Sequence, residues 1–410
     1  MDLNITKKKR IAFFIYSSRD INTYPTVINA ILILQINSFV IDLYLPEAML
    51  SKAIFPTYVT PIAISKQNPF DYVFNVLSYI KSNSLSYDFS FAFDLRSLLI
   101  SYLLNTKYKM FLPTAYFSLE LVYLSYFKRW IKQLPRTVGK LLFRYQIKEA
   151  IYNFIELYYW AKIQRSHPKF FKFAIIQDDA RANLLKIEFP FLSDKIFLVP
   201  NSYIGYNAST SDYAFKKFKI PDKKKIVLLT GSLERGFDLD LFKICDTLSE
   251  DYILFLNCYS RDNYLEYIFS NYAHLIREGR LFINDINLEK AEYDELVKSA
   301  YIGIAWLPLA AMSIPNLYYM GLSSGKLTKY LSCGKPVIAP SYLYDYKKLI
   351  DANNIGCTCT NTSEIPYKVE WIQNNYSNIQ QSIKTFYITN VEYERCFKNV
   401  LSEIIKLTNK

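Results

Sequence analysis

Short apolar runs alternate along the chain with longer segments in which apolar residues recur every three or four positions. An apolar run of roughly four to eight residues predicts a buried strand, and the three-and-four spacing predicts an amphipathic helix. In the first half of the chain, strands are predicted at residues 11–16, 39–45, 89–93, 108–112, 173–176 and 196–199, and helices at 26–34 and 71–81. A proline-containing loop is predicted between residues 45 and 71. This alternation is typical of an α/β fold with parallel sheets.

The second half of the chain repeats the same alternation. Strands are predicted at residues 226–229, 252–257, 281–284, 302–306 and 336–339, and helices at 292–300 and 392–407. Because a single core stops growing at about 250–300 residues, a chain of 410 residues favours two domains. The repeated pattern therefore predicts two similar α/β domains in succession.

Residues 321–341 combine a helix start, a tight helix end and a short strand. Ser323 and Ser324 are good N-cap residues, and Gly325 allows the backbone to approach a ligand closely. A helix that begins with Ser-Ser-Gly-Lys brings together free backbone N–H groups, two hydroxyl groups and the Lys326 ammonium, which suits phosphate. An ordinary capped helix with a solvated Lys326 explains these four residues equally well.

A glycine followed by a lysine at a helix start also occurs in P-loop ATPases. That motif needs a glycine five residues before Gly325 and Ser or Thr after Lys326. Met320 and Leu327 occupy these two positions. The sequence therefore excludes a P-loop.

Composition places the chain among globular proteins, because 51% of its residues are hydrophobic and it contains 36 Tyr and 29 Phe. Its 6 cysteines lie in the second half without paired spacings, and only 2 histidines are present. This distribution argues against a zinc site and favours reduced thiols in a cytosolic protein. The formal net charge of +12 indicates an anionic partner such as a nucleotide or an anionic lipid. No recognised nucleic-acid-binding motif accompanies the charge, so no nucleic-acid partner is expected.

The residues from Ser323 onward resemble the donor-site motif of GT-B glycosyltransferases, especially glycosyltransferase family four and related bacterial surface-polysaccharide glycosyltransferases. The matching residues are Ser323, Lys326, Leu327, Tyr330, Leu331, Gly334, Lys335, Pro336, Val337 and Ile338. The resemblance implies two Rossmann-like domains facing each other across a cleft, with residues 1–200 binding the acceptor and residues 201–385 binding a nucleotide sugar. It also implies a hinge at Pro200-Asn201-Ser202 and a last helix, in residues 386–410, that returns to the first domain.

The same resemblance implies a nucleotide-diphosphate sugar of the UDP or GDP type as donor, with no cofactor and no metal. The donor-binding residues that it implies are Gly231, Ser232, Arg235, Ile286, Asn316, Ser323, Ser324, Gly325 and Lys326. The chain departs from the family where many members carry two glutamates that grip the donor sugar and the ribose, because Gly321 and Lys329 stand there. This departure leaves the donor sugar and the stereochemical outcome open.

Two carboxylates follow predicted strands of the first half, and both are candidates for the general base of an inverting transfer. Asp94 follows the strand at residues 89–93, and Glu120 follows the strand at 108–112. Asp94 would equally serve as the N-cap of a helix that begins near Ser97, and Glu120 as a solvated loop residue. Glu120 is the preferred base, because its loop leads into a basic segment.

Between Lys128 and Lys148, that basic segment carries seven basic residues and no acidic one, interleaved with aromatic and aliphatic side chains. Such a segment suits the headgroup layer of an anionic membrane, although a solvated helix face has the same composition. The expected location is therefore the cytoplasm, peripheral at the inner face of the plasma membrane.

These observations predict a metal-independent glycosyltransferase that moves a sugar from a nucleotide-diphosphate sugar to a glycan or lipid-linked acceptor in bacterial cell-surface polysaccharide or glycoconjugate biosynthesis. Because Gly321 and Lys329 replace the two glutamates, an alternative stands beside it. In that alternative, the chain is a catalytically reduced GT-B scaffold that binds nucleotide or membrane as a partner subunit.

Overall fold

The structure is a computed structural model that describes residues 8–16, 21, 24–50, 55, 58–65, 69–121, 158, 163, 170–190, 195–233, 240–260, 264–309, 312 and 315–409. Arg235 and the segment between Lys128 and Lys148 lie outside the described residues. The chain divides into two compact units, which are described separately. Unit 1 comprises Met1–Val199 and Cys396–Lys410, and unit 2 comprises Pro200–Arg395.

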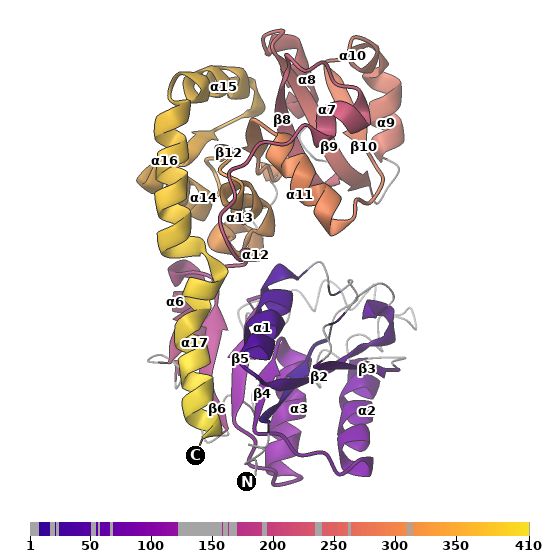
Figure 1. Ribbon diagram of the computed structural model, residues 1–410, viewed down its shortest axis with the longest axis vertical. Helices are drawn as coiled ribbons and strands as arrows, with labels where there is room; N and C mark the ends of the chain where they lie inside the picture. Colours follow the sequence, from indigo (N-terminus) through magenta and orange to yellow (C-terminus); the bar gives the residue numbers. More distant parts are fainter. Residues whose placement is uncertain are drawn as a thin grey trace, which may run out of the picture. The chain divides into compact units, whose positions relative to one another are not determined.

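Unit 1 contains, in its described residues, a seven-stranded parallel sheet with the strand order β3-β2-β1-β4-β5-β6-β7 (Figure 1). The strands are β1 (Arg10–Phe14), β2 (Val40–Pro46), β3 (Val59–Ile64), β4 (Phe89–Ala92), β5 (Thr114–Phe117), β6 (Phe171–Ile176) and β7 (Ile196–Leu198). The helices of this unit are α1 (Pro25–Ile36), the 3-10 helix η2 (Glu47–Met49), α2 (Pro69–Ser82), α3 (Leu95–Thr106) and α6 (Asp179–Glu188). Strand order reverses between β1 and β4, so their carboxyl ends form the switch point at which doubly wound sheets bind ligands.

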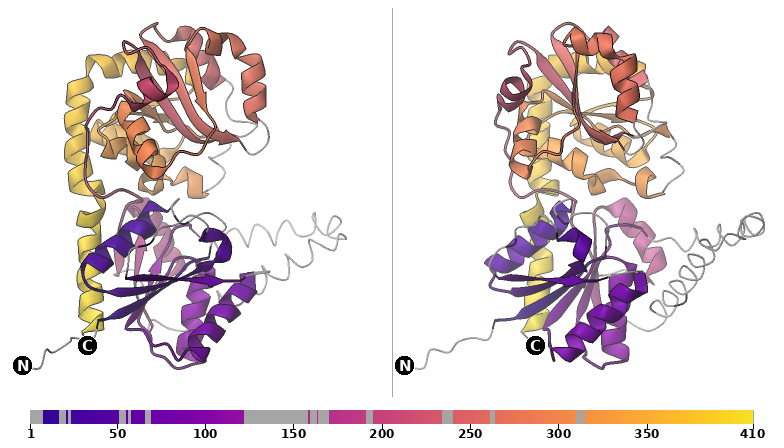
Figure 2. Two further views of the ribbon diagram at one scale, coloured as in Figure 1. Left: turned by 45° about the vertical axis from the view of Figure 1, so that its right-hand side comes forward. Right: turned by 90° about the vertical axis from the view of Figure 1, so that its right-hand side faces the viewer.

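The strands of unit 1 are apolar along most of their length, as expected for a parallel sheet covered on both faces. Aromatic rings in and directly after neighbouring strands pack against one another, with ring centroids 4.8 Å apart for Phe13 and Phe91 and 5.2 Å apart for Phe93, which follows β4, and Phe117. The final helix, α17 (Tyr393–Thr408), contributes residues 396–408 to this unit. Figure 2 shows this part of the helix running alongside the sheet.

Two sequence predictions for unit 1 were wrong. Strand β3 forms within the predicted proline-containing loop, because Pro61 lies on an edge strand, where a missing N–H is tolerated. No strand forms at residues 108–112, because Lys109 and Phe111 both adopt a left-handed backbone with φ of 52°. The strand forms instead at Thr114–Phe117, which is buried throughout.

Unit 2 contains, within its described part, a six-stranded parallel sheet with the order β10-β9-β8-β11-β12-β13. The strands are β8 (Lys225–Leu233), β9 (Tyr252–Ser260), β10 (Leu281–Asn284), β11 (Ile302–Ile304), β12 (Val337–Pro340) and β13 (Gly356–Cys359). The helices are α7 (Tyr213–Phe218), α8 (Asp240–Thr247), α9 (Tyr264–Asn271), α10 (Ala273–Arg277), α11 (Lys290–Ser299), α12 (Pro315–Tyr318), α13 (Gly325–Ser332), α14 (Tyr344–Asn353), α15 (Ile365–Asn374) and α16 (Tyr376–Phe386). Three shorter helical turns are η6 (Gly321–Ser323), η7 (Thr362–Glu364) and the π-helical η8 (Tyr387–Val391). The α/β fold class predicted from the sequence is confirmed.

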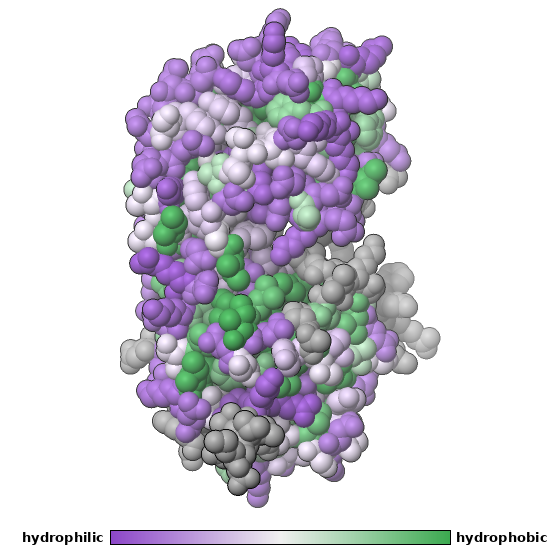
Figure 3. All heavy atoms as spheres, viewed as in Figure 1, coloured by the Kyte–Doolittle hydropathy of each residue, from purple (hydrophilic) through white to green (hydrophobic). Residues whose placement is uncertain are grey.

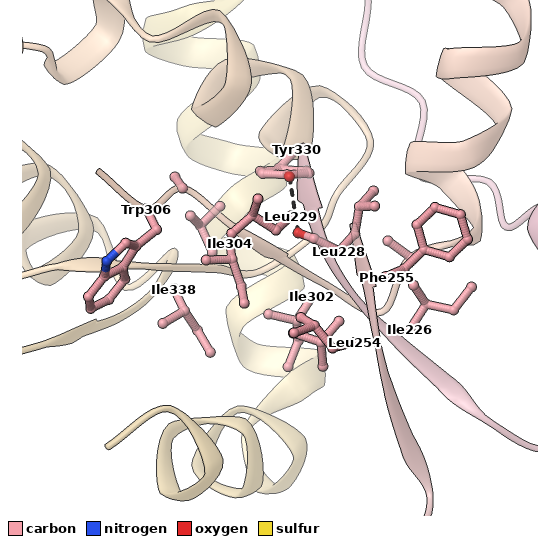
Figure 4. Close-up of a cluster of buried hydrophobic side chains, with 14 of the residues drawn as sticks. Ile226, Leu228, Leu229, Leu254, Phe255, Ile302, Ile304, Trp306, Tyr330 and Ile338 are labelled. Carbon is pink, nitrogen blue, oxygen red and sulfur yellow. Dashed lines mark hydrogen bonds between the residues drawn. The ribbon is translucent and has the colours of Figure 1, made fainter. Parts of the chain in front are cut away.

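Helix α13 is fixed tightly on the sheet of unit 2 (Figure 4). The Tyr330 hydroxyl donates a hydrogen bond of 3.0 Å to the carbonyl oxygen of Leu228 in β8. A Cβ atom placed on Gly303 of β11 would lie 2.3 Å from the Tyr330 ring, so only glycine permits this contact. Gly334 ends α13 with a left-handed φ of 68°, as its position before Lys335-Pro336 predicts.

None of the helices in the described ranges is long and apolar enough to cross a membrane.

Candidate functional site

Two of the predicted donor residues, Gly231 and Lys326, meet at the switch point of unit 2, where the carboxyl ends of β8 and β11 lie side by side. Gly231 has φ of 116°, a backbone conformation that other residues rarely adopt. A Cβ atom at this position would lie 3.3 Å from both Cε and Nζ of Lys326. The lysine side chain therefore lies directly against the glycine backbone. Gly231 and Ser232 belong to β8, so the strand predicted to end at residue 229 extends to Leu233.

The first turn of α13 supplies backbone donors beside Lys326. Ser324 is the N-cap residue, and its side-chain oxygen accepts a hydrogen bond of 3.2 Å from the Leu327 N–H. The Tyr346 hydroxyl donates to the same oxygen at 2.8 Å. The Ser324 hydroxyl thus has a structural role, whereas the N–H groups of Gly325 and Lys326 have no acceptor among the described residues.

Lys326 is a partly buried cation without a counter-ion. Among the described residues, no carboxylate pairs with its ammonium and no acceptor hydrogen-bonds to it. Burial lowers the pKa of Lys326 below the usual 10.5, and the nearby Cys258 thiol opposes this effect. Since desolvation disfavours the ammonium form, a bound anion would stabilise it. The geometry at Gly231 and the first turn of α13 therefore favours a phosphate-binding site.

A buried hydroxyl cluster holds the end of β8 against two helices. The Thr230 hydroxyl lies 3.3 Å from the Tyr293 hydroxyl of α11 and 3.2 Å from the Tyr330 hydroxyl of α13. Burial raises the pKa of Tyr293 to about 12, so its hydroxyl keeps its proton at neutral pH. These contacts place Gly231, the residue after Thr230, at a fixed distance from α13.

The remaining predicted donor residues follow neighbouring strands. Ile286 lies in the loop after β10 with 72% of its surface exposed, and its carbonyl oxygen accepts a hydrogen bond of 2.9 Å from Asn284. Asn316 lies in α12, after β11, and Ser323 ends η6. Both helical turns precede α13, so the structure places these residues in the segment that leads to α13.

Sequence reasoning did not assign Asn201 to this site. Its side-chain amide donates a hydrogen bond of 3.1 Å to the Ser323 carbonyl oxygen. A Cβ atom on Gly325 would lie 3.2 Å from the same amide nitrogen. The hinge prediction drew attention to Asn201, but no local pattern indicates a partner more than 100 residues away.

In unit 1, Asp94 acts as the N-cap of α3, which was one of the two roles predicted for it. Its carboxylate accepts hydrogen bonds from the Ser97 N–H at 2.9 Å, the Ser97 hydroxyl at 2.9 Å and the Tyr16 N–H at 2.8 Å. Burial raises the pKa of Asp94, although these hydrogen bonds act in the opposite direction. A carboxylate with three donors has little capacity left for a substrate hydroxyl.

Glu120 lies in the loop after β5 with an exposed side chain. The backbone of this loop is fixed by side chains from the region after β6. Gln177 donates to the Ser118 carbonyl oxygen at 2.8 Å, and the buried Arg181 donates to the Leu119 carbonyl oxygen at 3.1 Å. The structure therefore combines an accessible carboxylate with a well-fixed backbone at the carboxyl edge of the sheet.

Within the described ranges, no group of three or more His, Cys, Asp and Glu side chains is arranged to hold a metal ion.

Solved structures match the chain over almost its whole length, whereas no family model and no curated protein matches it. WaaG, a glycosyltransferase involved in lipopolysaccharide biosynthesis, matches with a TM-score of 0.60 and 12% identity over 95% of this chain and 98% of that chain. HepE of Anabaena, in complex with UDP-glucose, matches with a TM-score of 0.64 and 11% identity over 97% and 99% of the two chains. A UDP-N-acetylglucosamine 2-epimerase matches with a TM-score of 0.54 and 12% identity over 92% and 91%. These similarities confirm the predicted GT-B fold.

Proposed function

We propose that this protein is a glycosyltransferase that binds a nucleotide-diphosphate sugar through unit 2 and transfers the sugar to a glycan or lipid-linked acceptor. The observation that carries the proposal is the partly buried Lys326 ammonium, which lies against Gly231 at the start of α13 without a counter-ion among the described residues. A diphosphate would supply the missing negative charge. WaaG, a glycosyltransferase that shares the fold, supports a transferase, and the UDP-glucose bound to HepE makes UDP the first nucleotide to test.

The chemistry of transfer explains why such a site is useful. When the bond between the sugar and the diphosphate breaks, negative charge develops on the leaving phosphate, and fixed positive groups that stabilise it lower the barrier. Lys326 and the backbone N–H groups of Gly325 and Lys326 would provide this stabilisation. Because these groups already supply positive charge, the proposal requires no divalent cation.

Unit 1 would bind the acceptor, with Glu120 as the general base that takes the proton from its hydroxyl. We place this acceptor at the inner face of the plasma membrane. In support of a membrane contact, Ile36 at the end of α1 is 81% exposed, and apolar side chains gather on this part of unit 1 in Figure 3. The basic segment between Lys128 and Lys148 would add electrostatic attraction to anionic lipids.

The first test is the replacement Lys326→Ala, followed by calorimetric titration with UDP, GDP, UDP-glucose and inorganic pyrophosphate. Loss of a charge-assisted hydrogen bond of roughly 1.5–3 kcal/mol should weaken binding by about 10- to 150-fold. Lys347→Ala is the matched control, because Lys347 pairs with Asp351 on the surface of the same unit at 2.5 Å. The control should bind like the unmodified protein.

Unchanged nucleotide affinity in a folded Lys326→Ala variant would contradict the phosphate site. Product analysis with UDP-sugars separates the remaining possibilities. Transfer to an acceptor supports the proposal, epimerisation of the sugar points to the activity of the epimerase that shares the fold, and binding without turnover supports the catalytically reduced scaffold.

A further inference from the structure

An ion pair with a buried lysine and a half-buried aspartate lies one helical turn from Lys326. Lys329, three residues after Lys326 on α13, places its Nζ atom 2.6 Å from Oδ1 of Asp294 on α11. The same ammonium lies 4.6 Å from the ring centroid of Tyr203. The Lys329 side chain is 6% exposed, whereas that of Asp294 is 32% exposed. The pair is therefore closed on the lysine side and open to solvent on the aspartate side.

The fold by itself does not require charges here. Burying an ammonium such as that of Lys329 costs several kcal/mol, and an apolar residue of similar size often serves as well. No other ion pair or hydrogen bond engages Asp294 among the described residues. Its second carboxylate oxygen is thus available to a ligand, while Lys329 holds the first oxygen and the Tyr203 ring packs against the Lys329 ammonium.

The helix that carries Asp294 contacts the strand of the proposed phosphate site. Its neighbour Tyr293 reaches the Thr230 hydroxyl at 3.3 Å, and Thr230 directly precedes Gly231 of the phosphate site. Helix α11 also follows the loop after β10, which carries the exposed Ile286. This side chain offers an apolar surface against which a nucleobase could pack. Asp294 therefore lies on a helix that contacts the strand carrying Gly231, directly after the residue that makes this contact.

A carboxylate accepts hydrogen bonds and repels phosphate, so its partner must be a neutral group that donates hydrogen bonds. In a nucleoside diphosphate, the hydroxyl groups next to the phosphates are those of the ribose. Carboxylates bind ribose hydroxyls in other Rossmann-like folds.

We propose that Asp294 accepts hydrogen bonds from the ribose hydroxyls of the bound nucleotide, and that Lys329 and Tyr203 are positioning residues for it. This inference rests on the proposed nucleotide-binding function. It predicts that unit 2 distinguishes ribonucleotides from deoxyribonucleotides, a selectivity that the phosphate site cannot provide.

The experiment measures the affinity of the full-length protein for UDP, GDP, their 2′-deoxy analogues and inorganic pyrophosphate by calorimetric titration. The unmodified protein should prefer the ribose form of its nucleotide by about 10-fold or more. Asp294→Asn should remove this preference and leave the pyrophosphate affinity unchanged. Lys329→Met should reduce the preference without abolishing pyrophosphate binding, and Asp351→Asn, an equivalent change at a surface pair, should have no effect.

Equal affinity of the unmodified protein for the ribose and deoxyribose forms overturns the inference without any variant. A preference that survives in Asp294→Asn overturns it as well. If Asp294→Asn weakens UDP-glucose but not UDP, the carboxylate contacts the transferred sugar instead, and the assignment to ribose is wrong. Failure of the unmodified protein to bind nucleotide and pyrophosphate would instead contradict the proposed function.

Discussion

Lys326, Lys329 and Lys335 lie within or beside one short helix, yet each has a different electrostatic environment. Lys326 is without a counter-ion among the described residues, Lys329 pairs with Asp294, and Lys335 is 2% exposed with no ion pair in the described ranges. Burial lowers the pKa of both Lys326 and Lys335, whereas Asp294 compensates the charge of Lys329. We therefore expect the surroundings of each ammonium to determine its role, with Lys326 binding a ligand, Lys329 orienting Asp294 and Lys335 reducing stability.

Lys335 should reduce stability at neutral pH. Burial lowers the pKa of Lys335 from 10.5 to about 8, which corresponds to roughly 3 kcal/mol. Below pH 8 the group is charged in both states and the folded protein bears the full cost. Between about pH 8 and 10.5 the unfolded state binds more protons, so the contribution of Lys335 to stability rises with pH.

Lys335→Met should therefore stabilise the protein by up to about 3 kcal/mol at pH 7, and the gain should shrink toward zero near pH 10.5. Urea unfolding at pH 7, 9 and 10.5 measures this difference. Lys347→Met, at an exposed lysine, controls for the change in net charge. A gain that does not depend on pH would show that packing, rather than desolvation, causes it.

The two candidate bases of unit 1 should respond differently to substitution. Asp94→Ala removes the N-cap of α3 and should lower stability by about 0.5–2 kcal/mol.

Glu120→Gln should leave stability unchanged, because the side chain is exposed. It should lower turnover by roughly 10²- to 10⁴-fold without changing donor affinity. Turnover, donor affinity and unfolding measured on the same samples test both expectations. Normal turnover in Glu120→Gln would exclude Glu120 as the base.

At the scale of elements, strands with clear apolar runs and helices with strong N-cap residues were predicted well. The strand at residues 281–284 and the helix that begins after Ser324 coincide with β10 and α13, because local composition determines both. Strand β3 was missed because Pro61 is normally a poor strand residue, and only its position on the edge of the sheet makes it acceptable. Residues 108–112 are apolar enough for a strand, but the left-handed backbone of Phe111 depends on tertiary structure.

Prediction of the candidate site from the sequence is limited in the same way, because some of its contacts depend on tertiary structure. Lys326 and Gly231 were identified because each stands in a short pattern with a physical meaning. Asp294 and Asn201 were not identified, because their partners lie 35 or more residues away and no spacing in the sequence relates them. A contact between two helices, such as the one between Lys329 and Asp294, becomes visible only when the fold positions both elements.

At the scale of the whole molecule, the chain leaves unit 1 at Val199 and the last fifteen residues, Cys396–Lys410, belong to unit 1 again. Helix α17 accordingly buries Phe397, Val400 and Ile404 completely. Burial of each such side chain contributes about 1.5–3 kcal/mol, and total domain stability is only about 5–15 kcal/mol. The last helix should thus be necessary for the stability of unit 1.

Truncation after Arg395 should therefore destabilise unit 1 and leave the proposed nucleotide site of unit 2 intact, because all residues of that proposed site precede the truncation. Calorimetry should show an early or missing transition for unit 1, together with a second transition that UDP still shifts upward. Truncation after Thr408 retains the whole helix and should unfold like the full chain. If removal of residues 396–410 abolishes nucleotide binding or lowers both transitions equally, the two units do not unfold independently, and α17 stabilises the molecule as one cooperative unit.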